Sequence, residues 1–456
     1  MNKIARRSAI AIVLAGVLLL GFGVFIVRFL LFSDQWVITS GSPHVYTVHD
    51  QGNDEVLECG VAVDPDSNLL LDMREDWTYS NNSDLRRAMI HWVGDRENNI
   101  IAPALNTYVY EMTGHDTFNG MYAYGDETSV IQLTLSAQIQ IKALQALGDY
   151  TGTVAVYNYQ TGELICSVST PNFDPDNLPQ EAIEGMYFNR FTEAQYTPGS
   201  IFKVVTLAAA LETIPDIEQQ TFTCTGSYTI GADQITCESN HWDQDLKTAF
   251  QNSCNCAFAQ IALQVGAENM EKYAQQFGIT ESVRFDGITT AKGQYQAVNA
   301  DDVNIAWSGI GQYHDLINPC SYLTFIGAVA NGGKQVGPYV VEKISVGDKV
   351  TYQVQDRDGK QLLSEETVAK IREYMRNNAL AYGADRFGEL TVCAKTGTAQ
   401  IDGQTEPNAM LVGFVTDPEY PLAFIVCAEN AGYGGQVCIP IAGQVLDACK
   451  HYMDSN

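Results

Sequence analysis

The stretch that decides the fold is residues 196–211, which read YTPGSIFKVVTLAAAL. Pro198 and Gly199 interrupt the preceding loop, and a run of good helix formers follows them. A Pro-Gly pair in front of such a run predicts the start of a helix. Because the run is apolar almost all round, we expect this helix to be buried.

Two polar residues in this helix, Ser200 and Lys203, stand three positions apart and therefore share one face. Ser200 falls in the first turn, where free N–H groups and the positive end of the helix dipole favour developing negative charge. A desolvated lysine can lose its proton near neutral pH and act as a base. The pair therefore indicates an activated serine nucleophile. Alone, S-x-x-K is expected about once by chance in a chain of this length, and a capping serine with a solvent-reaching lysine is the alternative.

A second motif is Ser253-Cys254-Asn255, and we expect the segment 243–280 to form two helices around it. Its hydroxyl can relay a proton, and its amide can bind a peptide carbonyl or N–H group. S-x-N is not specific by itself, since Ser80-Asn81-Asn82 matches it and reads as a polar turn.

The third motif, Lys395-Thr396-Gly397-Thr398, ends a predicted strand. A given tripeptide such as K-T-G has a chance expectation of roughly one in ten here. An edge lysine after an apolar run is costly unless it faces a cleft. A cation, two hydroxyls and a glycine that permits close backbone approach would suit a substrate carboxylate. An ordinary turn at a strand end is the alternative.

Composition bounds the class of protein. At 456 residues the chain has room for two or three domains. Its formal net charge is −28, and beyond residue 32 there are 22 basic against 54 acidic residues. This balance argues against nucleic acid as a partner, although acidity by itself can serve solubility alone.

The eleven cysteines are an odd number and include no C-x-x-C pair, so we do not expect a structural zinc site. Cys224 and Cys237 bracket a predicted hairpin at 225–233. They could be bridged in an oxidising compartment, and the bridged and free states both remain open.

The N-terminal residues 9–27 are continuously apolar or small, which is long enough to span a bilayer as a helix. Lys3, Arg6 and Arg7 precede them, so the positive-inside rule predicts a cytoplasmic N-terminus, with 33–456 outside. A cleaved signal peptide is the alternative. It is disfavoured because the apolar run is long and 29–35 offers no A-x-A-like cleavage site.

The remaining chain predicts an α+β protein. Strand patterns at 45–48 and 55–63 and a helical segment at 84–90 indicate a small module before residue 149. A hairpin near residue 160 and three strands between 390 and 430 would together form a five-stranded antiparallel sheet. We expect the helical middle to lie against this sheet and a closing helix to span 439–453.

In this order, the three motifs resemble the penicillin-recognising serine acyltransferases. The surrounding residues look like class B penicillin-binding proteins, over roughly 150–456. The matching stretches are 197–203, 252–255, 310–312 and 395–399. The resemblance implies an α+β fold with a transpeptidase domain at 150–456, built on a five-stranded antiparallel sheet with helices on both faces. A membrane anchor at 1–32 and a pedestal or dimerisation-like domain at 33–149 would precede it.

The resemblance also implies roles for the first two motifs. Ser200 would attack the penultimate D-Ala carbonyl of a peptidoglycan stem peptide, with Lys203 as its base. Ser253 would pass the proton to the leaving amine, and Asn255 would hold the donor peptide. An amine of a neighbouring stem would then resolve the acyl-enzyme.

For the third motif, the resemblance implies that Lys395, Thr396 and Thr398, with Gly397 between them, bind the terminal carboxylate or that of a β-lactam. Backbone N–H groups of Ser200 and Thr398 would form the oxyanion hole. The resemblance calls for no cofactor, metal or nucleic acid, and it makes a glycosyltransferase a possible partner.

The sequence departs from the family at two places. Residues 46–53 stand where the family has an Arg-Gly and Asp-Arg-Asn-Gly pattern, and Met410 stands where an aromatic residue is common. Alternative functions are a D,D-carboxypeptidase, a class D-like β-lactamase or β-lactam sensor, and a non-catalytic cell-wall scaffold. Asn255 counts against the class D group, which usually has a branched apolar residue there.

Overall fold

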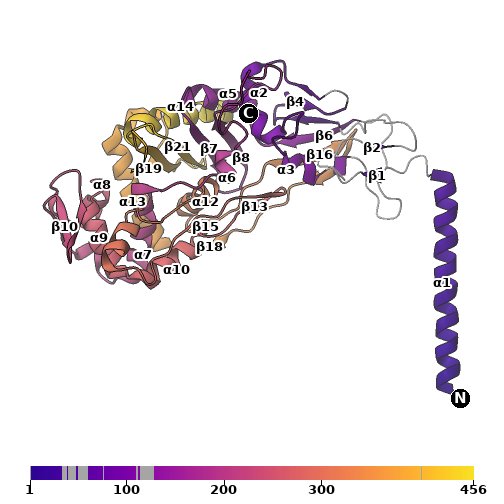
Figure 1. Cartoon of the computed structure of the whole chain (residues 1–456), viewed down its shortest axis with the longest axis horizontal. Coiled ribbons are helices and arrows are strands. Elements are labelled where there is room, and N and C mark those ends of the chain that lie inside the picture. Colours follow the sequence, from indigo (N-terminus) through magenta and orange to yellow (C-terminus); the bar gives the residue numbers. More distant parts are fainter. Residues whose placement is uncertain are drawn as a thin grey trace.

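The structure is a computed structural model that describes residues 2–32, 38–39, 48–49, 60–74, 77–108, 111–112, 128–401 and 403–455 (Figure 1). Its first helix, α1 (Asn2–Phe32), stands apart from the rest of the described chain. The span Lys3–Leu31 has a mean hydropathy of 3.0 and none of it is buried. At about 1.5 Å per residue, such a helix exceeds the roughly 30 Å of a bilayer core.

The predicted five-stranded sheet is present, with strand order β19-β20-β21-β7-β8 and antiparallel pairing throughout. Its strands are β7 (Gly152–Asn158), β8 (Leu164–Thr170), β19 (Val392–Ala399), β20 (Asn408–Val415) and β21 (Leu422–Ala428). β19, which carries the K-T-G motif, is an edge strand.

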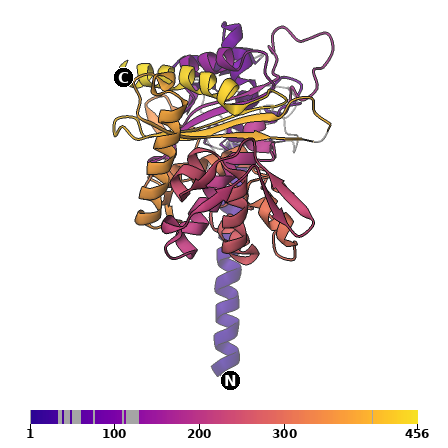
Figure 2. The same cartoon turned by 90° about the vertical axis from the view of Figure 1, so that its left-hand side faces the viewer.

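Helices cover both faces of this sheet, as the resemblance implied. Successive residues of a strand point to opposite faces, so Val154 and Val156 pack with α5 (Ala137–Leu147) and α14 (Gly434–Ser455), while Ala155 and Tyr157 join the core of the helical region. Figure 2 shows α14 above the strands and the helical region below them.

The helical region carries the nucleophile motif. A 3-10 turn, η2 (Gly199–Phe202), leads into α7 (Lys203–Thr213). The further helices are α8 (Leu246–Gln251), α9 (Asn255–Val265), α10 (Ala267–Gln276), α11 (Asp302–Ser308), α12 (Pro319–Ala330) and α13 (Glu365–Tyr382). The predicted helix break around Ser253-Cys254-Asn255 is confirmed, between α8 and α9. The number of helices at 243–280 is wrong, because Gly266 adopts a positive φ of 79° and separates α9 from α10, so that the segment holds three helices.

The hairpin predicted between Cys224 and Cys237 is confirmed. It consists of β10 (Ser227–Ile230) and β11 (Asp233–Thr236). Beside it, β9 (Phe222–Cys224) pairs with β12 (Trp242–Gln244).

The module near the N-terminus is built on a six-stranded sheet of order β17-β16-β6-β3-β4-β5. Its strands are β3 (Val61–Val63), β4 (Leu69–Asp72), β5 (Thr78–Tyr79), β6 (Ser129–Leu133), β16 (Val341–Val346) and β17 (Lys349–Gln353). The helical segment expected at 84–90 is α2 (Ser83–Val93). Residues 45–47 and 55–59 of the expected strands lie outside the described residues.

The two modules exchange elements across residue 149. The β16–β17 hairpin belongs to the segment 150–456 but pairs with β6 and so completes the six-stranded sheet. Conversely, α5 belongs to the segment before residue 150 but packs on the five-stranded sheet. The remaining short elements are β1 (Ile38–Thr39), β2 (Val48–His49), α3 (Pro103–Thr107), α6 (Arg190–Glu193), η3 (Ile217–Gln219), β13 (Arg284–Phe285), β14 (Ile288–Thr289), β15 (Lys334–Gln335), β18 (Lys360–Gln361) and η4 (Ala384–Phe387).

Candidate active site

Ser200 lies in the 3-10 turn that precedes α7, and its side chain is partly exposed. Two hydrogen bonds fix this turn. The Gly199 N–H group donates to Gly311 O at 2.8 Å, and the Tyr322 hydroxyl donates to Ile201 O at 2.7 Å. Because the turn is held from both sides, the serine hydroxyl has a defined position at the start of the helix.

Lys203 is fully buried and its ammonium nitrogen is surrounded by oxygen atoms. Nζ lies 3.0 Å from Ser200 Oγ, 3.1 Å from Ser253 Oγ, 2.6 Å from Ser253 O and 2.7 Å from Asn255 Oδ1. Ser253 O and Asn255 Oδ1 can only accept a hydrogen bond, whereas the two hydroxyls can also donate one. The geometry therefore accommodates a neutral amine that donates to the two carbonyl oxygens and accepts a proton from a hydroxyl.

Burial makes the neutral amine more accessible than in an ordinary lysine, because it lowers the pKa of Lys203 to about 8. At pH 7 about one tenth of such a lysine is neutral, against about one in three thousand at the ordinary lysine pKa. The predicted role of a base for Ser200 is thus compatible with both the distance and the charge of this side chain.

The Ser253 hydroxyl contacts the lysines of both the first and the third motif. Lys395, which is also buried, donates from Nζ to Ser253 Oγ at 2.9 Å and to Thr396 O at 3.0 Å. Burial, followed by the nearby charge of Lys203, holds the pKa of Lys395 well below its usual range. Two lysines that share one hydroxyl repel each other when both are charged, so the pair readily loses one proton.

The strand β19 lies directly against the serine turn, and Gly397 makes this approach possible. A methyl group at position 397 would lie 2.9 Å from Ile201 Cγ2 and 3.0 Å from Pro198 O. Thr396 and Thr398 flank this glycine and are partly exposed. The edge strand therefore presents hydroxyls and backbone groups beside the nucleophile, where a substrate could bind.

All eight residues predicted from the motifs lie in this one site. Asn255 is held in place by a further hydrogen bond, which its Nδ2 donates to Thr236 O at 2.9 Å.

The sequence analysis did not identify Tyr382. Its hydroxyl lies 3.1 Å from Thr396 Oγ1 and accepts the Thr396 N–H group at 3.2 Å. No local pattern at the end of α13 indicates this contact.

A substitution at Gly199 tests the tight packing of turn and strand. Gly199 has φ 53°, and a methyl group there would lie 2.5 Å from Thr398 O. We expect Gly199→Ala to destabilise the protein by about 2–4 kcal/mol, because it adds left-handed strain and a backbone clash. Thermal unfolding measures this loss. Gly435→Ala is the matched control, since nothing lies within 4 Å of the added carbon, and an unchanged Gly199→Ala would contradict the packing argument.

The fold and the site together define a class of protein, the serine acyltransferases. The arrangement offers a nucleophile with a buried amine base, a second hydroxyl bridging two lysines, and a cationic edge strand next to the nucleophile. A serine, two amines and hydroxyl relays can form and resolve an acyl-enzyme by proton transfer between these groups.

Comparison with known proteins identifies the family. The model of the penicillin binding protein transpeptidase domain matches residues 152–447, more than half of the chain. This chain belongs to that family, and its type is class B, as the motifs indicated.

Two curated relatives illustrate the similarity. Stage V sporulation protein D of Bacillus subtilis (strain 168) is 30% identical over 318 residues, covering 65% of this chain and 48% of that protein. Peptidoglycan D,D-transpeptidase PbpA of Mycobacterium tuberculosis (strain ATCC 25618 / H37Rv) is 26% identical over 365 residues, covering 70% of this chain and 72% of that protein. The chain thus spans about half the length of the first relative.

Solved structures agree on the fold. Penicillin-binding protein A from M. tuberculosis, in a ceftriaxone acyl-enzyme complex, superposes with a TM-score of 0.74 at 23% identity and covers 85% of this chain and 97% of its own. The D,D-transpeptidase domain of a peptidoglycan glycosyltransferase from Eggerthella lenta gives 0.74 at 21% identity, covering 87% and 99%.

Proposed function

We propose that this chain is a peptidoglycan D,D-transpeptidase that cross-links stem peptides through an acyl-enzyme on Ser200. The observation that carries the proposal is the convergence of three distant motifs on Ser253 Oγ, which lies 3.1 Å from Lys203 Nζ and 2.9 Å from Lys395 Nζ. Both amines are buried, and the nucleophile lies 3.0 Å from Lys203.

In the proposed acylation, Ser200 Oγ attacks the penultimate D-Ala carbonyl while its proton passes to neutral Lys203. The tetrahedral oxyanion is stabilised by the N–H groups of Ser200 and Thr398. The C–N bond then breaks, and the proton reaches the leaving D-Ala amine through Ser253. An amine of a neighbouring stem then attacks the ester carbonyl and gives a proton to Lys203. The ester C–O bond breaks, and Lys203 passes that proton to Ser200 Oγ, which restores the hydroxyl.

Substrate binding would decide which of the two lysines carries the positive charge. The terminal carboxylate of the stem peptide would lie beside Lys395, Thr396 and Thr398, and its negative charge favours the protonated form of Lys395. Lys203 can then remain the neutral partner. Asn255 would hold the donor peptide, and a β-lactam carboxylate would take the same place, so β-lactams would acylate Ser200.

We also propose that α1 anchors the chain in the bacterial membrane, with the N-terminus in the cytoplasm and the catalytic domain outside. Its length and hydropathy, together with Lys3, Arg6 and Arg7 before it, support this orientation. Cross-linking acts on the stem peptides of polymerised glycan strands, so a glycosyltransferase is part of the proposal as a partner.

The test uses the full chain in detergent with a stem peptide ending in D-Ala-D-Ala and an excess of an amine acceptor. We expect mass spectrometry to detect the acceptor joined to the shortened stem, with release of one D-Ala. Hydrolysed stem alone would identify a carboxypeptidase, and rapid turnover of a β-lactam would identify a β-lactamase. A folded chain that neither reacts with the stem nor retains a β-lactam would overturn the proposal in favour of a scaffold.

A further inference from the structure

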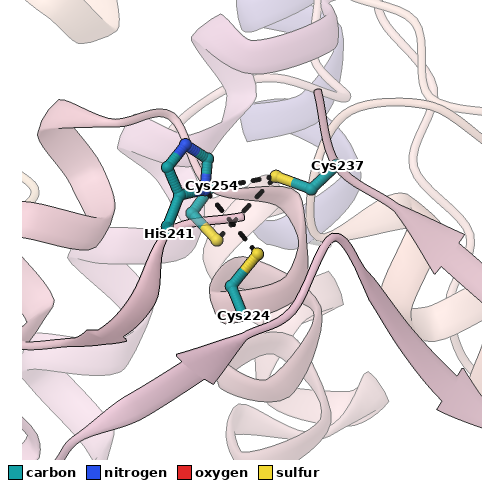
Figure 3. Close-up of side chains that lie close together, drawn as sticks. All are labelled: Cys224, Cys237, His241 and Cys254. Atoms are coloured by element: carbon teal, nitrogen blue, oxygen red, sulfur yellow. Dashed lines mark hydrogen bonds between the residues drawn. The ribbon is translucent and has the colours of Figure 1, made fainter. Parts of the chain in front are cut away.

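Three cysteines and one histidine gather beside the active site, although they come from four separate segments (Figure 3). Cys224 ends β9, Cys237 follows β11, His241 precedes β12, and Cys254 caps α9. Their ligand atoms all lie within 4.8 Å of one another. The Cys224–Cys237 bridge left open from the sequence is not formed, and both residues are free cysteines.

We propose that Cys224, Cys237, His241 and Cys254 form a tetrahedral zinc site. In such a site, Zn–S bonds of about 2.3 Å and Zn–N bonds of about 2.0–2.1 Å place neighbouring sulfurs about 3.8 Å apart and sulfur and nitrogen about 3.5–3.6 Å apart. Three of the six separations match these values, and all six stay within 4.8 Å. Cys237 Sγ lies 3.9 Å from Cys254 Sγ, and His241 Nδ1 lies 3.6 Å from Cys224 Sγ and 3.5 Å from Cys237 Sγ.

The surroundings of the histidine fit metal coordination through Nδ1. The opposite ring nitrogen, Nε2, lies 3.1 Å from Ser239 Oγ. With its proton on Nε2 the ring donates to this hydroxyl, and the Nδ1 lone pair faces the three sulfurs. A metal-binding histidine is characteristically oriented by such a bond from its second nitrogen.

The sulfur of Cys254 is placed where a thiolate is stabilised. It is the N-cap of α9, and it accepts the Ala257 N–H group at 3.4 Å. The positive end of the helix dipole favours negative charge at this position. Cys224 and Cys254 are fully buried, while Cys237 and His241 are partly exposed, so the site is shielded from bulk solvent but open to an entering ion.

Ligand type selects the ion. Three thiolates and one imidazole in a tetrahedral arrangement are typical of structural zinc sites, whereas magnesium and calcium prefer oxygen ligands. A disulfide between any two of these cysteines would use two sulfurs and leave the third thiol and the imidazole without a shared partner. The expectation of no zinc site rested on the missing C-x-x-C pair, and the fold supplies the ligands from more distant positions instead.

The site would position the second catalytic motif. Cys254 stands between Ser253 and Asn255, and Asn255 Nδ2 donates to the carbonyl of Thr236, the residue before Cys237. A zinc ion would therefore tie the β10–β11 hairpin to the loop that carries the proton relay. In this role the four ligands are positioning residues that do not touch substrate.

The test measures metal directly on the full chain, purified in detergent with reductant and without chelator. We expect elemental analysis to find about one zinc per chain, falling below about one fifth in Cys237→Ser and His241→Ala. Cys166→Ala is the matched control, since this buried cysteine lies on β8 away from the cluster, and it should retain the metal. Removing zinc with a chelator should lower the melting temperature and slow acylation by a fluorescent penicillin, and added Zn²⁺ should restore both.

Two results would overturn the proposal. One is a reduced, folded chain that neither contains zinc nor takes up added Zn²⁺. The other is a disulfide between two of the three cysteines, located by peptide mapping of protein isolated without reductant after its free thiols have been blocked. Ser200→Ala should keep its zinc while losing acylation, so failure of the metal site and failure of the proposed enzymatic function remain distinguishable.

Discussion

Ser200→Ala is expected to lose all covalent labelling by a fluorescent penicillin, a fall of at least about 10³-fold in acylation rate. In the proposed mechanism the ester of the acyl-enzyme forms on Ser200 Oγ, which lies in the turn before α7 with the buried amine of Lys203 3.0 Å away. Gel fluorescence after incubation with the labelled β-lactam measures the effect.

Ser80→Ala is the matched control for this variant. Ser80 belongs to the other S-x-N sequence of the chain and lies outside the catalytic cluster, so its removal should leave labelling unchanged. Covalent label that persists on Ser200→Ala would contradict the assignment of the nucleophile.

The second large effect concerns the proton on Lys203. Because burial lowers the pKa of Lys203 to about 8, the neutral, base-competent fraction should rise about tenfold per unit of pH below that value. We expect the acylation rate of the parent protein to follow this rise and to level off above pH 8. Stopped-flow or quenched labelling at a series of pH values measures this rise in the acylation rate.

The groups that act on this lysine come from several elements. Burial lowers the pKa of Lys203, while Glu238 and the cysteines 237, 254 and 256 raise it, and Lys203 in turn lowers the pKa of Lys395. Because the two lysines share Ser253, the observed midpoint belongs to the pair.

Lys203→Ala should reduce the acylation rate by about 10²–10⁴-fold and should abolish its rise with pH below pH 8. Lys203→Arg is the informative companion variant. Arginine keeps the positive charge but cannot act as a base near neutral pH, so it should be as inactive as the alanine variant. Activity retained by Lys203→Arg would mean that charge, not proton transfer, is what this position contributes.

Most of the candidate site was predictable because each motif is local. Ser200 and Lys203 meet because residues three apart on a helix share a face, and β19 was predictable from its apolar run. The order of the motifs then supplied the family resemblance and the roles. Distances between motifs, such as both lysines reaching Ser253, depend on how α7, α9 and β19 pack and are not encoded in any local pattern.

The parts that sequence reasoning missed are long-range or conformational. The contact of Tyr382 with Thr396 joins a helix end to a strand. The break between α9 and α10 falls at Gly266 (φ 79°), inside the stretch that was expected to form a single helix. The cysteine–histidine cluster likewise forms only when two β-ribbons and a helix end meet.

The return of residues 341–353 to the six-stranded sheet has a consequence for the order of folding. β6 pairs in parallel with β3 on one side and antiparallel with β16 on the other. Until β16 has been synthesised, one side of β6 is an unpaired edge that can associate with other chains. The sheet nearest the N-terminus therefore cannot be completed until β17, which ends at Gln353, has been synthesised, and a fragment ending at residue 149 should aggregate unless a peptide spanning 341–353 is supplied to close it.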